Sequence, residues 1–177
     1  MTSQAATTQT VQAIIVESRV LREGAPIPLD YTTDGRNISP DLTWRNVPSG
    51  ARSLVVAVED LDYRADTPAL IPMLHWVVYN ISPGVTSLAE GYPLVEVITA
   101  PMELAGACQA HVVFDRFGYN GPQPLPGELH RYRFSVYALD RAPDLAKGQT
   151  ARQVMLDIAG NVIAQGHLTA TYQRDAR

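Results

Sequence analysis

Cysteine and clustered basic residues are what this 177-residue chain has least of. Cys108 is its single cysteine, and the net charge is −4 with no block of lysine or arginine. One thiol forms neither an internal disulfide nor a four-thiolate zinc site. A weakly acidic chain without a basic block is a poor partner for nucleic acid. The sequence therefore excludes a disulfide scaffold and a cysteine-based zinc domain, and it argues against nucleic-acid binding.

Long apolar runs and targeting signals are also missing. No run approaches the roughly 20 apolar residues that a membrane-spanning helix needs. The opening MTSQAATTQT has neither a positive n-region nor an apolar h-region. Residues 1–10 are small and polar, which predicts a disordered tail. We expect a soluble, cytoplasmic protein without a transmembrane segment, in which a single domain over residues 11–177 follows this tail.

Short segments with strand-like patterning dominate the rest of the chain. They predict strands over 12–18, 27–32, 41–45, 52–60, 74–81, 130–139 and 167–172. Only 150–163 has the spacing of a helix, with Thr150 as its N-cap and Gly166 closing the segment. Many short strands with one late helix predict a mainly β protein of two packed antiparallel sheets with a helical appendage.

Acidic residues gather where the strand at 52–60 ends. Asp60 and Asp62 belong to the stretch EDLD, and Asp66 follows shortly after in the stretch DTP. Side chains at the end of a strand lie on the rim of its sheet, where loops held by a rigid scaffold commonly carry binding sites. The alternative is a solvated turn without a function.

Two histidines and a tyrosine are the other candidate residues. His75 lies inside the apolar run MLHWVVYNI, so it needs a hydrogen-bonding partner or is a satisfied core histidine. His130 and Tyr132 share one face of their strand, because side chains alternate along it. They follow the loop GPQPLPG, whose prolines fix the backbone and lower the entropy lost on ordering. The loop is either a plain sheet connection or the preformed wall of a small-ligand site.

The chain resembles the phosphatidylethanolamine-binding protein family, and most of all its prokaryotic, Raf-kinase-inhibitor-like branch. Four stretches carry the resemblance: YTTDGRNISPDLTW, SLVVAVEDLD…DTP, HWVVYNI and GPQPLPGELHRYRFSVYALD. It extends from about Val16 to Tyr172. The resemblance implies a large central antiparallel sheet packed with a smaller sheet, Greek-key connections, a C-terminal helix and a small anion-binding pocket at one rim. The implied pocket residues are Asp60 or Asp62 with Asp66, then His75, Gly121, Pro122, Pro124, His130 and Tyr132.

Histidine suits a phosphate site because its charge changes near neutral pH. A neighbouring carboxylate raises the pKa of a histidine, so we expect the acids to keep His75 and His130 oriented and charged. The ligand is then a small anionic or phosphorylated molecule. If Asp60 is the first acid, Leu61 stands where the family usually has proline. Asp60 with Asp66 fits slightly better than Asp62 with Asp66.

Three functions remain open at this point. The first is a binding or regulatory module for phosphorylated or phospholipid-head-group ligands. The second, implied by the resemblance, is an inhibitor of a protease or kinase that uses the same face. The third is an enzyme with His75, His130 and an aspartate as acid and base, although neither G-x-S-x-G nor a P-loop is present. The spacing matches no standard metal motif, so we expect no metal and no cofactor.

The segment before Gly121 departs from the family pattern. Within 92–113 it carries Ala110, His111, Val112 and Val113, where relatives often have a polar loop. These residues either alter the mouth of the pocket or pack in a dimer interface. We favour the interface and expect a homodimer.

Overall fold

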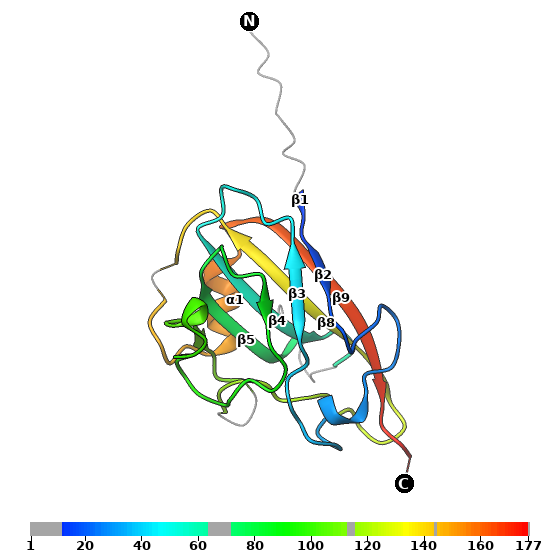
Figure 1. The fold of residues 1–177 in the computed structure, drawn as a ribbon. Helices are drawn as coiled ribbons and strands as arrows, with labels where there is room; N and C mark the ends of the chain where they lie inside the picture. The colour runs from blue at the N-terminus through cyan, green and yellow to red at the C-terminus, as the bar shows by residue number, and fades with distance from the viewer. Residues whose placement is uncertain (1–11, 64–71, 113–115, 144, 177) are drawn as a thin grey trace, which may run out of the picture.

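Two β-sheets form the body of the chain (Figure 1). The structure, a computed structural model, describes residues 12–63, 72–112, 116–143 and 145–176. In spatial order the large sheet consists of β1 (Gln12–Ala13), β9 (Val162–Gln173), β8 (Leu129–Leu139), β4 (Ser53–Asp60), β5 (Met73–Ile81) and β7 (Cys108–Gln109). The small sheet consists of β2 (Ile15–Glu17), β3 (Leu42–Arg45) and β6 (Ser87–Leu88). The predicted mainly β fold of two sheets is confirmed. Its pairs are antiparallel except β1 with β9, which are parallel.

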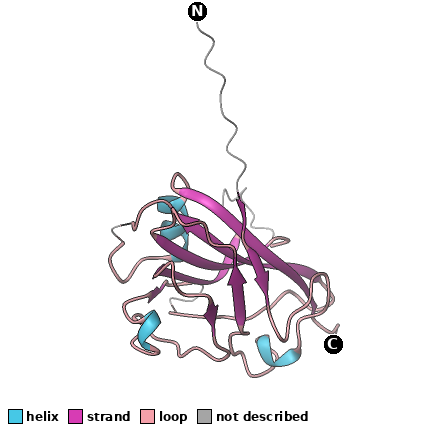
Figure 2. Cartoon of the chain, turned by 45° about the horizontal axis from the view of Figure 1, so that its top comes forward, coloured by secondary structure: helices cyan, strands magenta, loops and turns pink. Residues whose placement is uncertain are grey.

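The two faces of the large sheet are covered differently. β4 is buried along its whole length because it lies at the centre of three layers. Val56 and Val58 point into a core shared with the small sheet, whereas Val55 and Ala57 point into a second core that includes α1 (Ala151–Ile158). Figure 2 shows α1 against one face of the sheet. A strand covered on both faces carries a continuous apolar run, which explains the sequence SLVVAV.

The connection between β5 and β8 places the polar ends of β4, β5 and β8 next to one another. After β5 the chain passes through β6 and β7, and β8 then returns beside β4 instead of β5, a connection of Greek-key type. In the register of β4 and β8, Asp60 lies opposite Tyr132 and Glu59 lies opposite Arg133. Neighbouring side chains of a strand point to opposite faces. The ends of β4, β5 and β8 therefore present two separate groups of polar side chains, one on each face.

Glu59 anchors the group on the helix-covered face. Its carboxylate accepts hydrogen bonds from Nε of Arg133 at 2.9 Å, from the hydroxyl of Ser135 at 3.2 Å and from the hydroxyl of Tyr137 at 3.3 Å. The side chain of Glu59 is only 4% exposed. These hydrogen bonds satisfy the buried carboxylate, so Glu59 has a structural role in the sheet.

A β-bulge sets the direction of His75. Val58 of β4 pairs with Trp76 of β5, and the next residue, Glu59, pairs with Leu74. His75 is thus the extra residue of β5, and the bulge bends the strand there. Leu74 packs in the core on the helix side and Trp76 in the core on the other side. The bulge frees the imidazole from the strict alternation of the strand.

The predicted strand at 12–18 is divided between the two sheets. β1 joins the large sheet and β2 joins the small one, with Ile14 between them. The crossing requires close contact with β9, because a Cβ built on Gly166 would lie 1.7 Å from the carbonyl oxygen of Ile14. Gly166 was predicted to close the helical segment, but it lies inside β9. Because it has no side chain, Gly166 lets the backbone at Ile14 approach β9 closely.

Two other boundary predictions are wrong. Residues 27–32 contain the 3₁₀ helix η1 (Leu29–Tyr31) instead of a strand, because Pro26 and Pro28 lack the N–H groups of a ladder. The helix at 150–163 ends at Ile158, since β9 begins at Val162 and pairs with β8. Its predicted N-cap is confirmed: Oγ1 of Thr150 accepts a hydrogen bond from the backbone N–H of Gln153 at 3.2 Å.

The segment preceding Gly121 packs largely against its own chain. Ala110 is fully buried and so cannot contribute to the predicted dimer interface, whereas Val112 is half-buried against the helix-side core. Val113 lies outside the described residues. The same segment includes the 3₁₀ helix η2 (Met102–Leu104) and leaves Met102 83% exposed.

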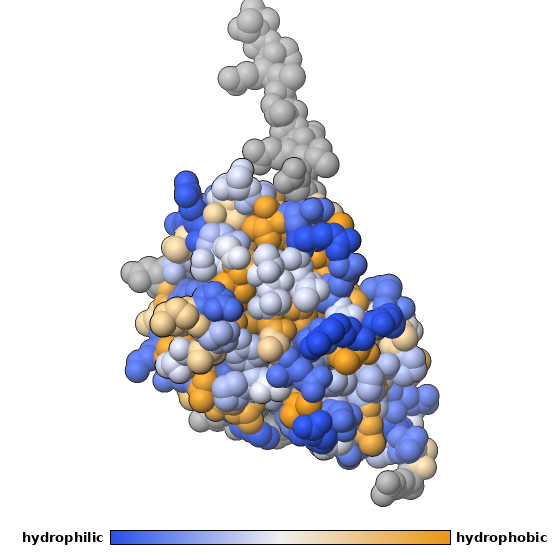
Figure 3. All heavy atoms as spheres, in the orientation of Figure 1, coloured by the Kyte–Doolittle hydropathy of each residue, from blue (hydrophilic) through white to orange (hydrophobic). Residues whose placement is uncertain are grey.

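The face over the small sheet carries polar and apolar residues side by side (Figure 3). Within the described residues, no helix combines the length and the apolarity that a membrane crossing requires. The predicted tail at 1–10 falls outside the described residues.

Candidate functional site

Four polar side chains from three strands meet at one end of the large sheet. They are Asp60 at the end of β4, His75 near the start of β5, and His130 and Tyr132 at the start of β8. Their residues are only 3%, 3%, 8% and 0% exposed, respectively. The ring of Tyr132 meets His75 edge-on, with centroids 5.3 Å apart, and stacks on His130 at 6.3 Å. Buried polar groups normally have hydrogen-bonding partners, so the contacts of these four side chains define the chemistry of the site.

Asp60 is the acid that faces the histidines. Its Oδ2 atom lies 2.8 Å from Nδ1 of His130 and 3.9 Å from Nε2 of His75. Its Oδ1 atom accepts hydrogen bonds from the backbone N–H groups of Asp62 and Tyr63, at 3.0 and 2.9 Å. The carboxylate therefore both orients His130 and fixes the turn that follows β4.

Asp62 has a different neighbour. It accepts hydrogen bonds from the backbone and guanidinium of Arg131, which is on the opposite face of β8 from His130 and Tyr132. The hydrogen bonds from Arg131 lower the pKa of Asp62 from 3.8 to about 2. Of the two acids left open by the sequence, Asp60 is the one in contact with a histidine. Asp66, the predicted second acid, lies outside the described residues.

The imidazole of His75 is fixed as one tautomer. Its Nδ1 atom lies 2.7 Å from the backbone carbonyl oxygen of Asn120, which can only accept, so Nδ1 carries the hydrogen. The backbone N–H of Asn120 in turn donates to the carbonyl of His75 at 2.8 Å. Nε2 is buried and has no hydrogen-bonding partner among the described residues.

The pKa of His75 moves in the opposite direction to the one predicted. Burial lowers it below the usual 6.5, although the Asn120 carbonyl and the charge of Asp60 oppose the change. The carboxylate oxygen 3.9 Å away is too distant to compensate for lost solvation. The expectation of a charged His75 is therefore wrong, and its Nε2 presents a lone pair.

His130 lies between two carboxylates. Nδ1 faces Asp60 at 2.8 Å, and Nε2 faces Oε2 of Glu128 at 3.3 Å. Because carboxylates accept and do not donate, these contacts suit a ring that donates from both nitrogens, the imidazolium form. The side chain of Glu128 is 52% exposed, so an arriving ligand can take its place beside Nε2.

Tyr132 lies behind the floor of the pocket, with its ring packed against those of His75 and His130. The residue is fully buried, and its hydroxyl has no hydrogen-bonding partner among the described residues. Burial, together with the charge of Asp60, raises its pKa, so the hydroxyl keeps its proton. Tyr132 therefore supports the two histidines from behind.

The Gly-Pro loop is held in place by the turn at 31–37. Gly121 donates its N–H to Oδ1 of Asn37 at 2.7 Å, and the carbonyl of Pro122 accepts from the N–H of Thr33 at 3.2 Å. A Cβ on Gly121 would lie 2.6 Å from the carbonyl oxygen of Tyr31, so only glycine allows this approach. The turn near η1 (blue) and the yellow-green loop lie side by side in Figure 1. Gly121 and Pro122 thus position the wall without lining the pocket, whereas Pro124 lines it.

The pocket enclosed by these residues measures about 810 Å³. The sequence interpretation missed several of its lining residues: Tyr63, Met73, Asn120, Gln123, Leu125, Glu128 and Leu129. Three are large, apolar or aromatic and exposed at the mouth, namely Tyr63 at 49%, Leu125 at 68% and Leu129 at 58%. In the sequence, the only indication that these three residues line a pocket is that apolar or aromatic side chains occur in or beside exposed loops. The result is a polar floor beneath an apolar rim.

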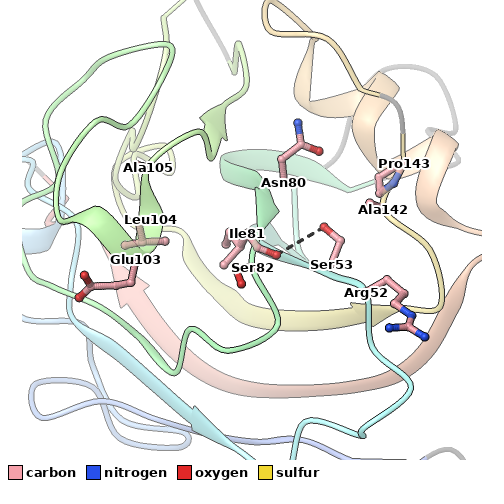
Figure 4. Close-up of a pocket in the computed structure, with 10 residues that line it drawn as sticks. All are labelled: Arg52, Ser53, Asn80, Ile81, Ser82, Glu103, Leu104, Ala105, Ala142 and Pro143. Carbon is pink, nitrogen blue, oxygen red and sulfur yellow. Dashed lines mark hydrogen bonds between the residues drawn. The ribbon is translucent and has the colours of Figure 1, made fainter.

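A second, smaller hollow of about 230 Å³ lies at the opposite end of β4 (Figure 4). Ser53, at the start of β4, is hydrogen-bonded to the carbonyl of Ile81 at 3.5 Å. The side-chain N–H of Asn80 donates to the carbonyl of Leu145 at 2.9 Å. These groups are occupied by the chain itself, so the larger pocket is the candidate functional site.

No metal centre emerges from the described part of the chain. There, no three histidine, cysteine, aspartate or glutamate side chains gather as an ion would require.

Comparison with known proteins gives the family. The model of the phosphatidylethanolamine-binding protein family matches residues 17–173. The chain belongs to the phosphatidylethanolamine-binding protein family. A UPF0098 protein of Aquifex aeolicus is 38% identical over 162 residues, which are 90% of this chain and 88% of the relative. A UPF0098 protein of Chlamydia trachomatis is 37% identical and covers 89% of this chain and 97% of its own length.

Solved structures agree with this assignment. A phosphatidylethanolamine-binding protein homologue from Chlamydia trachomatis superimposes with a TM-score of 0.76 at 36% identity, over 92% of this chain and 99% of that one. YbcL of Escherichia coli, described as a member of the mammalian family, gives a TM-score of 0.76 at 28% identity over the same shares. The predicted family and fold are thereby confirmed.

Proposed function

We propose that this chain binds a small phosphorylated or similarly anionic ligand in the large pocket, in a binding or regulatory role. The observation that carries the proposal is His130, which lines the pocket and is held between two carboxylates. A hydrogen bond with one charged partner contributes roughly 1.5–3 kcal/mol. A ligand oxygen that takes the place of Glu128 beside Nε2 of His130 gains such a bond.

The composition of the lining favours binding over catalysis. Its described residues include no serine, threonine, cysteine or lysine, which are common side chains for covalent catalysis. The wall is also preformed, because Gly121 and Pro122 are hydrogen-bonded to the turn at 31–37. A preformed wall lowers the entropy cost of holding a small ligand.

Sulfate binding tests the proposal, because sulfate keeps one charge state across the relevant pH range. Its affinity, measured by calorimetry, is expected to fall from mildly acid to mildly alkaline pH, because only a cationic imidazole attracts the anion and histidine is the side chain whose charge changes in this range. His130→Ala removes one charge-assisted hydrogen bond of ~1.5–3 kcal/mol and should weaken binding roughly ten- to a hundredfold. His167→Ala is the matched control, since His167 is exposed on the neighbouring strand β9. Normal sulfate binding by His130→Ala, with no dependence on pH, would refute the proposal.

A further inference from the structure

Nε2 of His75 is the unusual atom of this pocket. It is buried without a partner among the described residues, while Nδ1 is committed to the carbonyl of Asn120 at 2.7 Å. A neutral imidazole with hydrogen on Nδ1 has a lone pair on Nε2 and can only accept there. A bare oxyanion placed against this atom would meet a lone pair instead of a donor.

The charges around His75 also favour a ligand group that donates a hydrogen bond to Nε2 over a bare oxyanion. Asp60 faces it from β4 with Oδ2 3.9 Å away, the ring of Tyr132 meets it edge-on from β8 with centroids 5.3 Å apart, and the charge of His130 acts on it from the same strand. Glu128 stands beyond His130, with Oε2 3.3 Å from Nε2 of that ring. The described lining residues include three acids and no lysine or arginine. A fully charged dianion is therefore a poor match for the His75 side of the pocket.

We infer that the ligand group reaching Nε2 of His75 carries a proton, either on a phosphoryl oxygen or on an ammonium group, and is not a bare oxyanion. The inference rests on the proposed binding function and defines the form of the ligand. His75 then accepts the ligand's hydrogen, while His130 donates to one of its remaining oxygens. The lowered pKa of His75, caused by burial, keeps this acceptor unprotonated at neutral pH.

The test compares two phosphonates that lose their second proton at different pH values. Methylphosphonate and difluoromethylphosphonate are similar in shape, but the fluorine atoms lower the second pKa of the latter. If the bound form carries a proton, the midpoint of affinity against pH follows the second pKa of each ligand. Sulfate, measured in parallel, reports the titration of the protein alone. The singly protonated phosphonate should bind roughly five- to a hundredfold better than the dianion, since the dianion leaves Nε2 unpaired.

His75→Gln is the informative variant, because glutamine keeps much of the side-chain volume and can turn an N–H group toward the ligand. In this variant the affinities of the two phosphonates should change with pH at the same midpoint as the affinity of sulfate. His167→Gln, on the exposed face of β9, is the matched control and should retain the wild-type difference. Should His75→Gln destabilise the fold, nitrogen NMR of the wild-type imidazole gives an independent reading: Nε2 of His75 should be unprotonated in the free protein.

Two further ligands identify the source of the proton. O-phosphoethanolamine and ethyl phosphate differ by the ammonium group. Equal affinities across the pH range assign the proton to the phosphoryl oxygen, whereas selective retention of O-phosphoethanolamine at alkaline pH assigns it to the ammonium. Either result supports the inference.

Failure of the inference differs from failure of the proposed function. If the phosphonates bind but share the sulfate midpoint in the wild-type protein, the inference is overturned and anion binding stands. Protonation of Nε2 in the free protein at neutral pH overturns it as well. If sulfate, the phosphonates and O-phosphoethanolamine all fail to bind at any pH, the proposed function itself is wrong, and the inference falls with it.

Discussion

Two buried tyrosines of this chain differ in what their hydroxyls contact. The hydroxyl of Tyr119 donates to the carbonyl of Tyr31 at 2.6 Å, whereas that of Tyr132 has no partner among the described residues. Both residues are almost completely buried, at 2% and 0% exposed. The fold therefore uses the first hydroxyl and leaves the second unpaired behind the pocket.

Exchanging each tyrosine for phenylalanine separates these roles. Tyr132→Phe should leave sulfate binding nearly unchanged, because Tyr132 lies behind the residues that line the pocket and not among them. Its free energy of unfolding should stay constant or rise by up to about 1 kcal/mol, because an unpaired buried hydroxyl disappears. Tyr119→Phe, the control, should lose about 1 kcal/mol of stability. Calorimetry and urea denaturation measure both effects, and a Tyr132→Phe protein less stable than Tyr119→Phe would contradict the assignment.

Asp62 and its partner Arg131 give a second prediction at the residue scale. The pKa of Asp62 is about 2 in the folded protein, against an ordinary 3.8, owing to hydrogen bonds from Arg131. A lowered pKa contributes stability above the unfolded value, and this contribution is lost as the pH falls from about 4 to about 2. Asp62→Asn should therefore flatten the decline of the unfolding free energy over this range.

The contribution of Asp62 should be small and sensitive to salt, because the pair lies at the surface. Urea denaturation at several pH values, with and without added salt, measures it. Sulfate binding should be unchanged or slightly stronger in Asp62→Asn, since Asp62 lines the pocket with its negative charge but is paired with Arg131. An equal acid dependence in both proteins would show that the pair does not affect stability.

At the scale of elements, the crossing of the N-terminal strand over β9 depends on one glycine. A Cβ on Gly166 would lie 1.7 Å from the carbonyl oxygen of Ile14, which is backbone and cannot rotate away. Gly166→Ala should therefore destabilise the protein by roughly 1–3 kcal/mol or more. Gly160→Ala is the control, because nothing lies within 4 Å of its Cβ position. Thermal unfolding of both variants measures the difference, and equal stabilities would contradict the close approach.

Most strands with clear apolar patterning could be predicted from the sequence, but the two-residue strands β6 and β7 and the first half of β9 could not. β4, β5 and β8 have 8, 9 and 11 residues, enough for apolar patterning to show. β6 and β7 have two residues each, too few for any period. The end of α1 was also misplaced, because Val162 satisfies the helical spacing but pairs with Leu139 in the sheet. Tertiary pairing overrides local preference at such boundaries.

Site residues could be predicted from the sequence where the alternation of side chains along a strand alone decides the face to which they point. His130 and Tyr132 share a face for this reason, and Asp60 joins them because it pairs with Tyr132 across the sheet. The direction of His75 depends on a bulge between β4 and β5, which has no local sequence signal. Its lowered pKa depends in turn on burial that only the packed fold reveals.

At the scale of the whole molecule, homodimerisation remains a prediction. The segment expected to form the interface buries Ala110 but exposes Leu94, Val95 and Met102, at 47%, 39% and 83%. Exposed apolar side chains are candidates for contact between copies. We expect a dimer mass by light scattering at micromolar concentration and a lower mass for Met102→Glu. Leu156→Glu, at an exposed position of α1, is the control, and a monomer mass for the wild-type protein would contradict the prediction.

The two exposed leucines at the mouth of the pocket bear on how its selectivity could be redesigned. Leu125 and Leu129 are 68% and 58% exposed, so replacing them should cost the fold little. The floor offers no such freedom, because Asp60 and His130 are bonded to each other and to the adjoining chain. Libraries confined to these two leucines would therefore vary which tail a ligand carries, while the chemistry that recognises its head stays constant.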